Sequence, residues 1–84
     1  MNSPVIVAEW PKNSRETVRV SLDQYRDRDT IDIRSWWTDA AGKLRPGKSG
    51  ITLAVRHLPD LAEAIDKALA EAKGRGLLDG RGQS

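Results

Sequence analysis

The chain of 84 residues has no cysteine, a single histidine and no long hydrophobic run. Without cysteine it forms neither disulfides nor thiolate metal sites, and one histidine does not make an ordinary zinc site. We therefore expect no metal and no cofactor. No apolar run reaches the roughly 18 residues that span a bilayer, and the N-terminus lacks a signal-peptide hydrophobic segment, so we expect a cytoplasmic protein.

The length indicates one small domain, residues 1–74, followed by a glycine-rich polar tail, 75–84, that we expect to be flexible. A domain of this size buries roughly 60% of the surface of its unfolded chain, so its stability is marginal without further support. Because disulfides and zinc are excluded, association with a second copy is the support that remains.

Basic and acidic side chains are unevenly distributed, although the formal net charge is only +2. Residues 26–56 carry seven basic and four acidic side chains, whereas residues 57–73 carry two basic and four acidic ones. Such a division favours an anionic partner on one side of the molecule. A mixed, solvated surface without a partner is the alternative that charge alone leaves open.

Four stretches show the patterns of β-strands. Residues 5–10 form a short apolar run before a turn, and residues 16–22, 30–37 and 51–55 alternate apolar and polar side chains. One face of these strands is apolar and is predicted to form the core, whereas the other face is open. The open face carries Thr17, Arg19, Ser21, Asp32 and Arg34.

Two predicted loops, 23–29 and 38–50, combine cations with aromatic or turn-forming residues. Aromatic rings stack on bases and cations neutralise phosphates, so we interpret the loops as two halves of one groove for a nucleic-acid strand. By itself, the first loop would be interpreted as an ordinary polar turn; only together with the second loop does it become a candidate for the groove. The residues that suggest the groove are Tyr25, Arg26, Arg28, Lys43, Arg45 and Lys48.

Trp36 and Trp37 end the third predicted strand. In a regular strand Trp36 shares the face of Arg34, and Trp37 shares the face of Ile33. Trp37 is then a core residue unless a bulge or the strand end redirects its ring. The spacing leaves open which of the two rings stacks on a base.

An amphipathic helix is predicted after the fourth strand. Pro59 and Asp60 suit its first turn, and Gly74 is expected to end it. Its alanine-rich apolar stripe permits close helix approach, and it can cover one face of the sheet and leave an edge for a partner. We expect the dimer interface to include Leu61, Ile65, Ala68 and Leu69.

The order and spacing of several motifs resemble the C-terminal domain of the positive cofactor 4 family of transcriptional coactivators. The resemblance includes the VRVSLDQY strand and the amphipathic helix, and it covers about residues 15–73. The matching motifs are IDIR at 31–34, Trp37, Gly42, PGK at 46–48 and GITL at 50–53.

This resemblance implies an α+β fold, in which a curved four-stranded antiparallel sheet is followed by one C-terminal α-helix, and a homodimer formed through the C-terminal region. It also implies binding of single-stranded DNA with little sequence preference, across the sheet face and its loops. It favours Trp37 over Trp36 as the stacking ring. The residues that match the family's DNA-contacting positions are Tyr25, Arg26, Arg28, Arg34, Trp37, Arg45 and Lys48.

Two positions depart from the family pattern. Asp27 stands where a glycine is common between the first-loop cations, and Ser49 stands where a lysine is common after PGK. Both changes are expected to weaken phosphate binding. The acidic, serine-rich N-terminal region of the eukaryotic members is also missing, so the chain is more similar to stand-alone prokaryotic relatives, which implies association with the nucleoid.

The favoured hypothesis is a dimeric single-stranded DNA-binding protein that acts in transcription regulation, repair or replication. One alternative is a small dimeric interaction module that recruits transcription or repair proteins. RNA binding is another, because nothing in the sequence distinguishes a 2′-hydroxyl. We expect no enzymatic activity, since no residues show acid–base or nucleophile spacing, and we interpret the lone His57 as structural.

Overall fold

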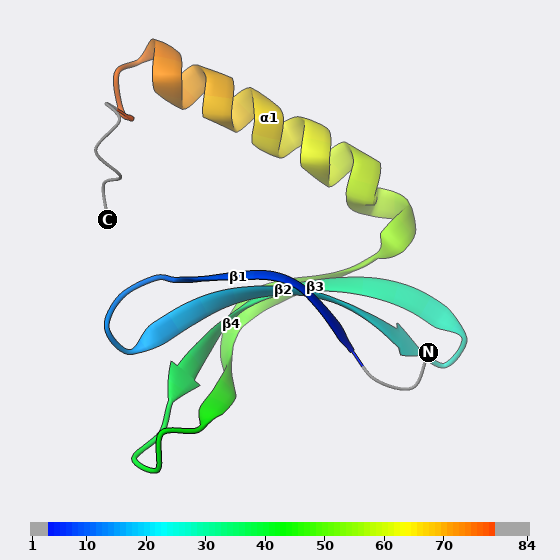
Figure 1. The fold of residues 1–84 in the computed structure, drawn as a ribbon. Coiled ribbons are helices and arrows are strands. Elements are labelled where there is room, and N and C mark those ends of the chain that lie inside the picture. Colours follow the sequence, from blue (N-terminus) through cyan, green and yellow to red (C-terminus); the bar gives the residue numbers. More distant parts are fainter. Residues whose placement is uncertain (1–3, 79–84) are drawn as a thin grey trace.

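In the computed structural model, which describes residues 4–78, a single antiparallel sheet is followed by one long helix (Figure 1). The four strands lie in the sheet in chain order, so each is hydrogen-bonded to the next. This confirms the predicted fold class, while residues 79–84 of the predicted tail lie outside the described residues. The elements are β1 Val5–Pro11, β2 Glu16–Tyr25, β3 Arg28–Thr38, β4 Leu44–Ala54, the 3-10 helix η1 Val55–His57 and α1 Leu58–Gly74.

One face of the sheet is apolar, as the alternation predicted. Leu22, Ile31 and Leu53 lie directly opposite one another on β2, β3 and β4. Ile31 is 5% exposed and is the only buried hydrophobic side chain among residues 4–78. The protomer therefore has little closed core, and much of its apolar surface remains accessible.

The turn between β2 and β3 is shorter than the predicted loop. β2 continues to Tyr25 and β3 begins at Arg28, so only Arg26 and Asp27 form the turn. Their φ angles are +51° and +65°, as in the type I′ turns whose twist matches that of a hairpin. The longer loop was a wrong prediction, because the polar residues that suggested it also suit solvent-exposed ends of paired strands.

The connection between β3 and β4 is also shorter than predicted, since β4 begins at Leu44. Arg45 and Lys48 were expected in a loop and instead lie in this strand. Pro46 and Gly47 suggested a turn, but β4 is an edge strand, where a missing N–H does not interrupt the sheet.

A bulge in β4 accommodates these turn-forming residues. The register shifts between the pairs Arg34–Gly50 and Trp36–Pro46, so β4 contributes extra residues opposite Ser35. A Cβ atom at Gly47 would lie 2.6 Å from the carbonyl oxygen of Ser35, which makes glycine necessary at this approach. The extra residues therefore lie in β4 alone, and β3 keeps its regular pairing with β2.

The helix α1 begins as predicted, with proline in its first turn and Asp60 near its N-terminus. Gly74 is the last helical residue, as predicted, and the chain turns at Gly76, whose φ is +72°. The amide of Leu77 donates to the carbonyl of Ala72, and the amide of Gly76 donates to the carbonyl of Lys73. These are the two bonds of a Schellman motif. No helix within residues 4–78 has the length and apolar character needed to cross a membrane.

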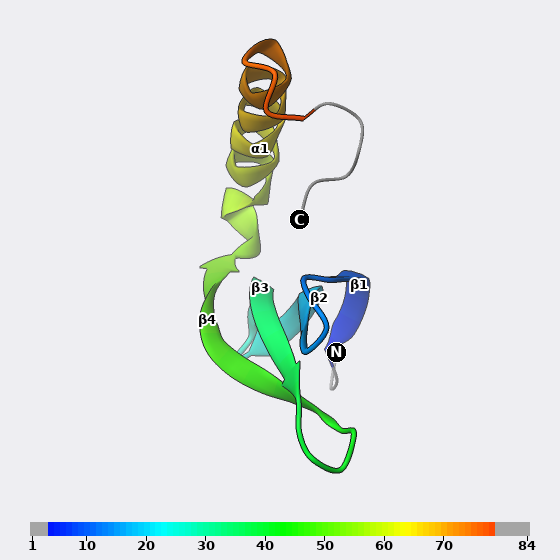
Figure 2. The same ribbon diagram turned by 90° about the vertical axis from the view of Figure 1, so that its left-hand side faces the viewer.

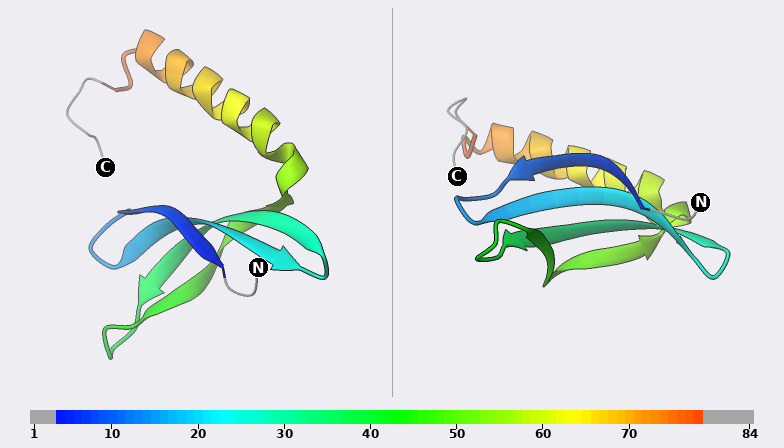
Figure 3. Two further views of the ribbon diagram at one scale, coloured as in Figure 1. Left: turned by 45° about the vertical axis from the view of Figure 1, so that its right-hand side comes forward. Right: turned by 60° about the horizontal axis from the view of Figure 1, so that its bottom comes forward.

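The helix does not close the core within the protomer. Figures 1 and 2 show α1 on one side of the sheet, joined to it through β4 and η1, and Figure 3 shows the same arrangement from two further directions. No residue of α1 is buried, and Ile65 and Leu69 are 58% and 44% exposed. The possibility that the helix covers one face of its own sheet is therefore not realised within the protomer. An amphipathic pattern indicates that a face requires a partner, but not which chain supplies it.

Candidate nucleic-acid interface

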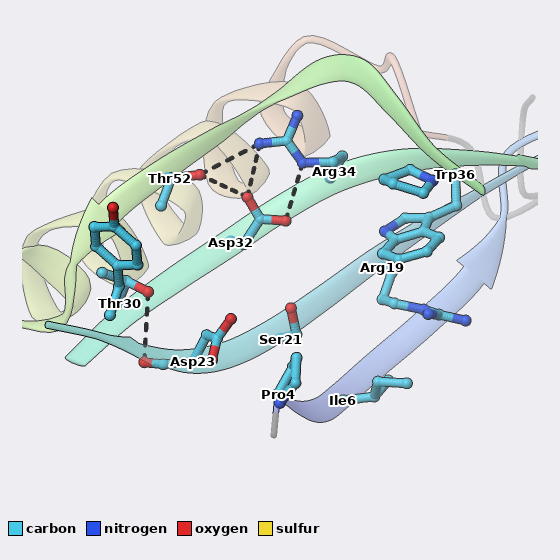
Figure 4. A pocket seen from close by; sticks show the side chains of 12 residues that line it. Pro4, Ile6, Arg19, Ser21, Asp23, Thr30, Asp32, Arg34, Trp36 and Thr52 are labelled. Carbon is cyan, nitrogen blue, oxygen red and sulfur yellow. Dashed lines mark hydrogen bonds and ion pairs between the residues drawn. The ribbon is translucent and has the colours of Figure 1, made fainter. Parts of the chain in front are cut away.

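The face of the sheet that points away from α1 is hollowed (Figure 4). The hollow has a volume of about 600 Å³, and all four strands contribute to it. Because strand side chains alternate between faces, β3 presents every second residue to this space. From β3 these residues are Thr30, Asp32, Arg34 and Trp36.

Arg34 is fixed at the centre of the hollow by hydrogen bonds. Its Nε donates to Oδ2 of Asp32 at 3.1 Å, its Nη2 donates to Oδ1 at 2.9 Å, and its Nη1 donates to the carbonyl of Gly47 at 3.1 Å. The hydroxyl of Thr52 donates to Asp32 at 2.7 Å. Figure 4 shows these three side chains joined in one network.

The same network sets the charge of both partners. Burial acts to raise the pKa of Asp32, but the hydrogen bonds from Arg34 and Thr52 and the charge of Arg34 hold that pKa below its usual range. The hydrogen bond to Asp32 in turn raises the pKa of Arg34. Arg34 is therefore a permanent cation in a fixed position.

Arg19 lies beside Arg34 in the hollow. Its guanidinium carbon is 4.3 Å from the centre of the Trp36 ring, and its Nε donates to Glu9 of β1 at 3.0 Å. The Nε1 atom of Trp36 is buried and has no partner among the described residues. Trp36 is thus a half-buried support for Arg19 rather than an open platform for a base.

The turn between β2 and β3 carries an exposed aromatic ring and two cations. Tyr25 is 65% exposed and lines the end of the hollow, and the guanidinium of Arg26 is 5.3 Å from its ring centre. Arg28 lies directly opposite Tyr25 across the hairpin. Within the part of the chain that the structure describes, neither arginine has a carboxylate partner.

The hairpin between β3 and β4 is organised around Asp39. This carboxylate accepts the amides of Ala41 and Lys43, each at 2.9 Å, and Nε of Arg45 at 2.8 Å. The hydrogen bond from Arg45, followed by those of the two amides, lowers the pKa of Asp39. Arg45 is therefore tied to an acid of its own hairpin, whereas Lys48 is exposed and has no ion pair among residues 4–78.

The two tryptophans follow the regular alternation. β3 pairs with β2 without interruption from Arg28 to Trp37, so Trp36 faces the hollow with Arg34 and Trp37 lies on the face of Ile33. The register shift that could have redirected Trp37 affects β4 instead. Trp37 is nevertheless 46% exposed, at the margin of the sheet opposite Arg45.

The structure thus brings only some of the predicted residues together. Tyr25 and Arg34 line the hollow, Arg26 and Arg28 lie at one end of it, and Trp37 with Arg45 lies on the opposite side of the strands. Sequence reasoning left Arg19 out of the predicted site, although alternation already placed it on the open face with Arg34. The predicted dimer residues lie on α1, with Ile65 and Leu69 accessible.

His57 lies exposed in η1. In the described part of the chain, no three histidine, aspartate or glutamate side chains gather closely enough to hold a metal ion.

Comparisons with known proteins agree with the fold. The chain matches the family described as Transcriptional Coactivator p15 (PC4) over residues 12–64. A putative RNA polymerase II transcriptional coactivator from Neurospora crassa is 34% identical over 58 residues, which are 69% of this chain and 33% of that protein. The chain therefore spans about a third of the length of that relative.

Two solved structures are similar over most of the chain. A PC4 homologue from Burkholderia pseudomallei has a TM-score of 0.72 and 25% identity, covering 81% of this chain and 92% of that one. MoSub1, described in complex with DNA, has a TM-score of 0.61 and 32% identity, covering 82% and 84%. The family match covers residues 12–64, which are more than half of this chain. The chain therefore belongs to the PC4 family, that of transcriptional coactivator p15.

Proposed function

We propose that this protein binds single-stranded DNA with little sequence preference, in transcription regulation or in repair or replication. The hollow of the sheet is the observation that carries this proposal. It combines the exposed ring of Tyr25, the fixed cation Arg34 and accessible cations at its margin. MoSub1, which has a similar fold, is described in complex with single-stranded DNA, and the relative from Neurospora crassa is described as a putative coactivator.

In the proposed mechanism, base and backbone are held by different side chains. Tyr25 stacks on a base, which is worth roughly 1–3 kcal/mol and does not depend on base identity. Phosphates are contacted by Arg34 and by the cations at the margin of the hollow, Arg26, Arg28 and Lys48. Binding therefore weakens as the salt concentration rises. The proposed activity is binding and involves no catalytic step.

We also propose that the functional unit is a homodimer. The apolar side of the sheet and the exposed Ile65 and Leu69 of α1 both lack a covering layer within residues 4–78. A second copy supplies a matching helix and sheet side at once. Sedimentation at micromolar concentration should show twice the mass of the 9.3 kDa chain. A species of protomer mass alone contradicts the dimer, and Ile65→Asp should dissociate or unfold it by burying a charge.

The binding proposal is tested by fluorescence anisotropy with labelled dT and mixed-sequence single strands, a blunt duplex and a matching RNA strand. Single strands should bind more tightly than the duplex at the same salt concentration, because a duplex hides the base faces that Tyr25 needs. Equal affinity for single strands and duplex would leave only a general basic surface. A clear preference for the RNA strand would replace DNA with RNA as the ligand.

A further inference from the structure

Two arginines are cross-strand neighbours in the hollow, and their guanidinium groups point to opposite edges of the sheet, Arg34 toward β4 and Arg19 toward β1. Arg19 on β2 is the cross-strand partner of Arg34 on β3, and both side chains line the hollow (Figure 4). Like charges in this arrangement repel each other. The repulsion is offset by one carboxylate for each arginine, since Arg19 pairs with Glu9 at 3.0 Å and Arg34 pairs with Asp32 at 2.9 Å.

The two arginines differ in how many donors the protein uses. Arg34 donates through Nε, Nη1 and Nη2, to Asp32, Gly47 and Thr52. Arg19 donates only through Nε, and its two terminal nitrogens have no acceptor within residues 4–78. The side chain of Arg19 is nevertheless only 15% exposed. The two terminal nitrogens are not among the buried polar atoms without a partner, so they are open to the hollow, where water or a ligand can accept their hydrogen bonds.

We propose that the terminal nitrogens of Arg19 bind a phosphodiester group of the nucleic-acid strand in the hollow, on the side lined by Trp36 and β1. The inference rests on the proposed function, because the strand supplies the phosphate. The planar fork of a guanidinium matches two phosphate oxygens, whereas an isolated ammonium does not. Stacking on Trp36 at 4.3 Å holds the plane of that fork in one orientation.

Glu9 acquires a defined role in this arrangement. It neutralises Arg19 in the free protein and is 45% exposed, so it competes with an incoming phosphate for the same guanidinium. Removing its charge should strengthen binding only as long as Arg19 is present. A purely structural Glu9–Arg19 pair predicts no such gain.

The test measures anisotropy of a labelled dT oligonucleotide over a salt series. Arg19→Gln should bind roughly tenfold more weakly, the loss expected for one hydrogen bond to a charged group. The slope of log K against log salt should flatten by about 0.7, as expected for one lost phosphate contact. Glu9→Gln should bind about threefold more tightly, and the double variant should lose that gain.

The helix provides matched controls, because Glu63 and Lys67 form an exposed ion pair at 3.9 Å on α1, outside the hollow. Lys67→Gln removes the same charge as Arg19→Gln, and Glu63→Gln the same charge as Glu9→Gln. Neither control should change the affinity or the salt slope by more than a small fraction of the effect in the hollow.

Thermal unfolding separates binding from folding. Arg19→Lys retains the charge without the fork, so it should keep the wild-type salt slope and still bind more weakly. If Arg19→Gln fails to fold, Arg19→Lys and Glu9→Gln carry the test. The inference is overturned if folded Arg19→Gln binds dT with wild-type affinity and slope, if Glu9→Gln gains no more than Glu63→Gln, or if only guanine-containing strands are affected. Failure of the wild-type protein to bind single strands at all would instead overturn the proposed function.

Discussion

The cations at the centre of the hollow differ in kind from those at its margin. Arg19 and Arg34 each have a carboxylate partner that fixes the position of the side chain. Arg26, Arg28 and Lys48 have no carboxylate partner among residues 4–78. A paired arginine is preorganised for a ligand, but a phosphate must compete with its carboxylate. An unpaired cation attracts the strand over a longer range and is screened by salt. Changes at the centre should therefore affect folding and binding together, and changes at the margin binding alone.

Replacement of Arg34 should show the largest difference between the two regions. Arg34→Ala removes the proposed phosphate contact and leaves Asp32 and Thr52 without their shared donor. We expect binding to weaken by about 1.5–3 kcal/mol and the urea midpoint to fall. Lys48→Ala is the marginal control, and it should reduce affinity and salt slope without changing the urea midpoint. Equal midpoints for Arg34→Ala and wild type would show that the central network does not support the fold.

The two tryptophans compare the hollow, which Trp36 lines, with the opposite face of the sheet, where Trp37 lies. Trp36→Ala should lower the melting temperature, because the partly buried ring supports Arg19. Trp37→Ala should remain folded, since its ring is 46% exposed. Because that ring lies on the face opposite the hollow, a loss of roughly 1–3 kcal/mol of binding would show that the strand also reaches this face and stacks there. Circular dichroism and anisotropy on both variants check this. An unfolded Trp37→Ala together with a folded, non-binding Trp36→Ala would reverse the assignment.

Most of the sheet was predictable because β2 and β3 alternate regularly, and each alternation assigns side chains to a face. The paired strands also kept Trp36 and Trp37 on the faces that parity indicated. The start of β4 was not predictable, since Pro46, Gly47 and Gly50 are turn formers in most settings. Only the edge position and the bulge opposite Ser35 make them compatible with a strand.

The site was less accessible to sequence reasoning than the fold. Charge and aromatic content selected Tyr25, Arg26 and Arg28 as candidates, and these residues are close in the chain. The pairing of Arg19 with Glu9, ten positions apart, depends on the register between β1 and β2 and on a bulge near Ile6. The sequence pattern alone does not specify that register. The apolar stripe of α1 was predictable in the same way, but amphipathicity alone does not determine whether the sheet of the same chain or a second copy covers it.

Acid should weaken the centre before it affects the margin. The pKa of Asp32 is lowered in the folded protein, so its contribution to stability is complete above its ordinary pKa and is lost as pH falls through the lowered value. The urea midpoint should be nearly constant from about pH 8 to 5 and decline below about pH 4. Asp32→Asn should show a shallower decline. A midpoint that falls between pH 7 and 5 would indicate a different titrating group.

The smallest expected effect lies at the turn, where Asp27 adds an acid between two unpaired cations. Asp27→Gly should strengthen binding of single strands by several-fold at most, because it removes one exposed charge next to Arg26 and Arg28. Glycine also tolerates the φ of +65° at this position, so Asp27→Gly should stabilise the hairpin through its backbone. Asp27→Asn separates these contributions, since asparagine removes the charge and accepts positive φ less readily than glycine. If the charge is responsible, both variants should bind equally tightly and lose the advantage at high salt, while only Asp27→Gly raises the melting temperature. A gain confined to Asp27→Gly, and insensitive to salt, would show that Asp27 limits the geometry of the turn rather than its charge.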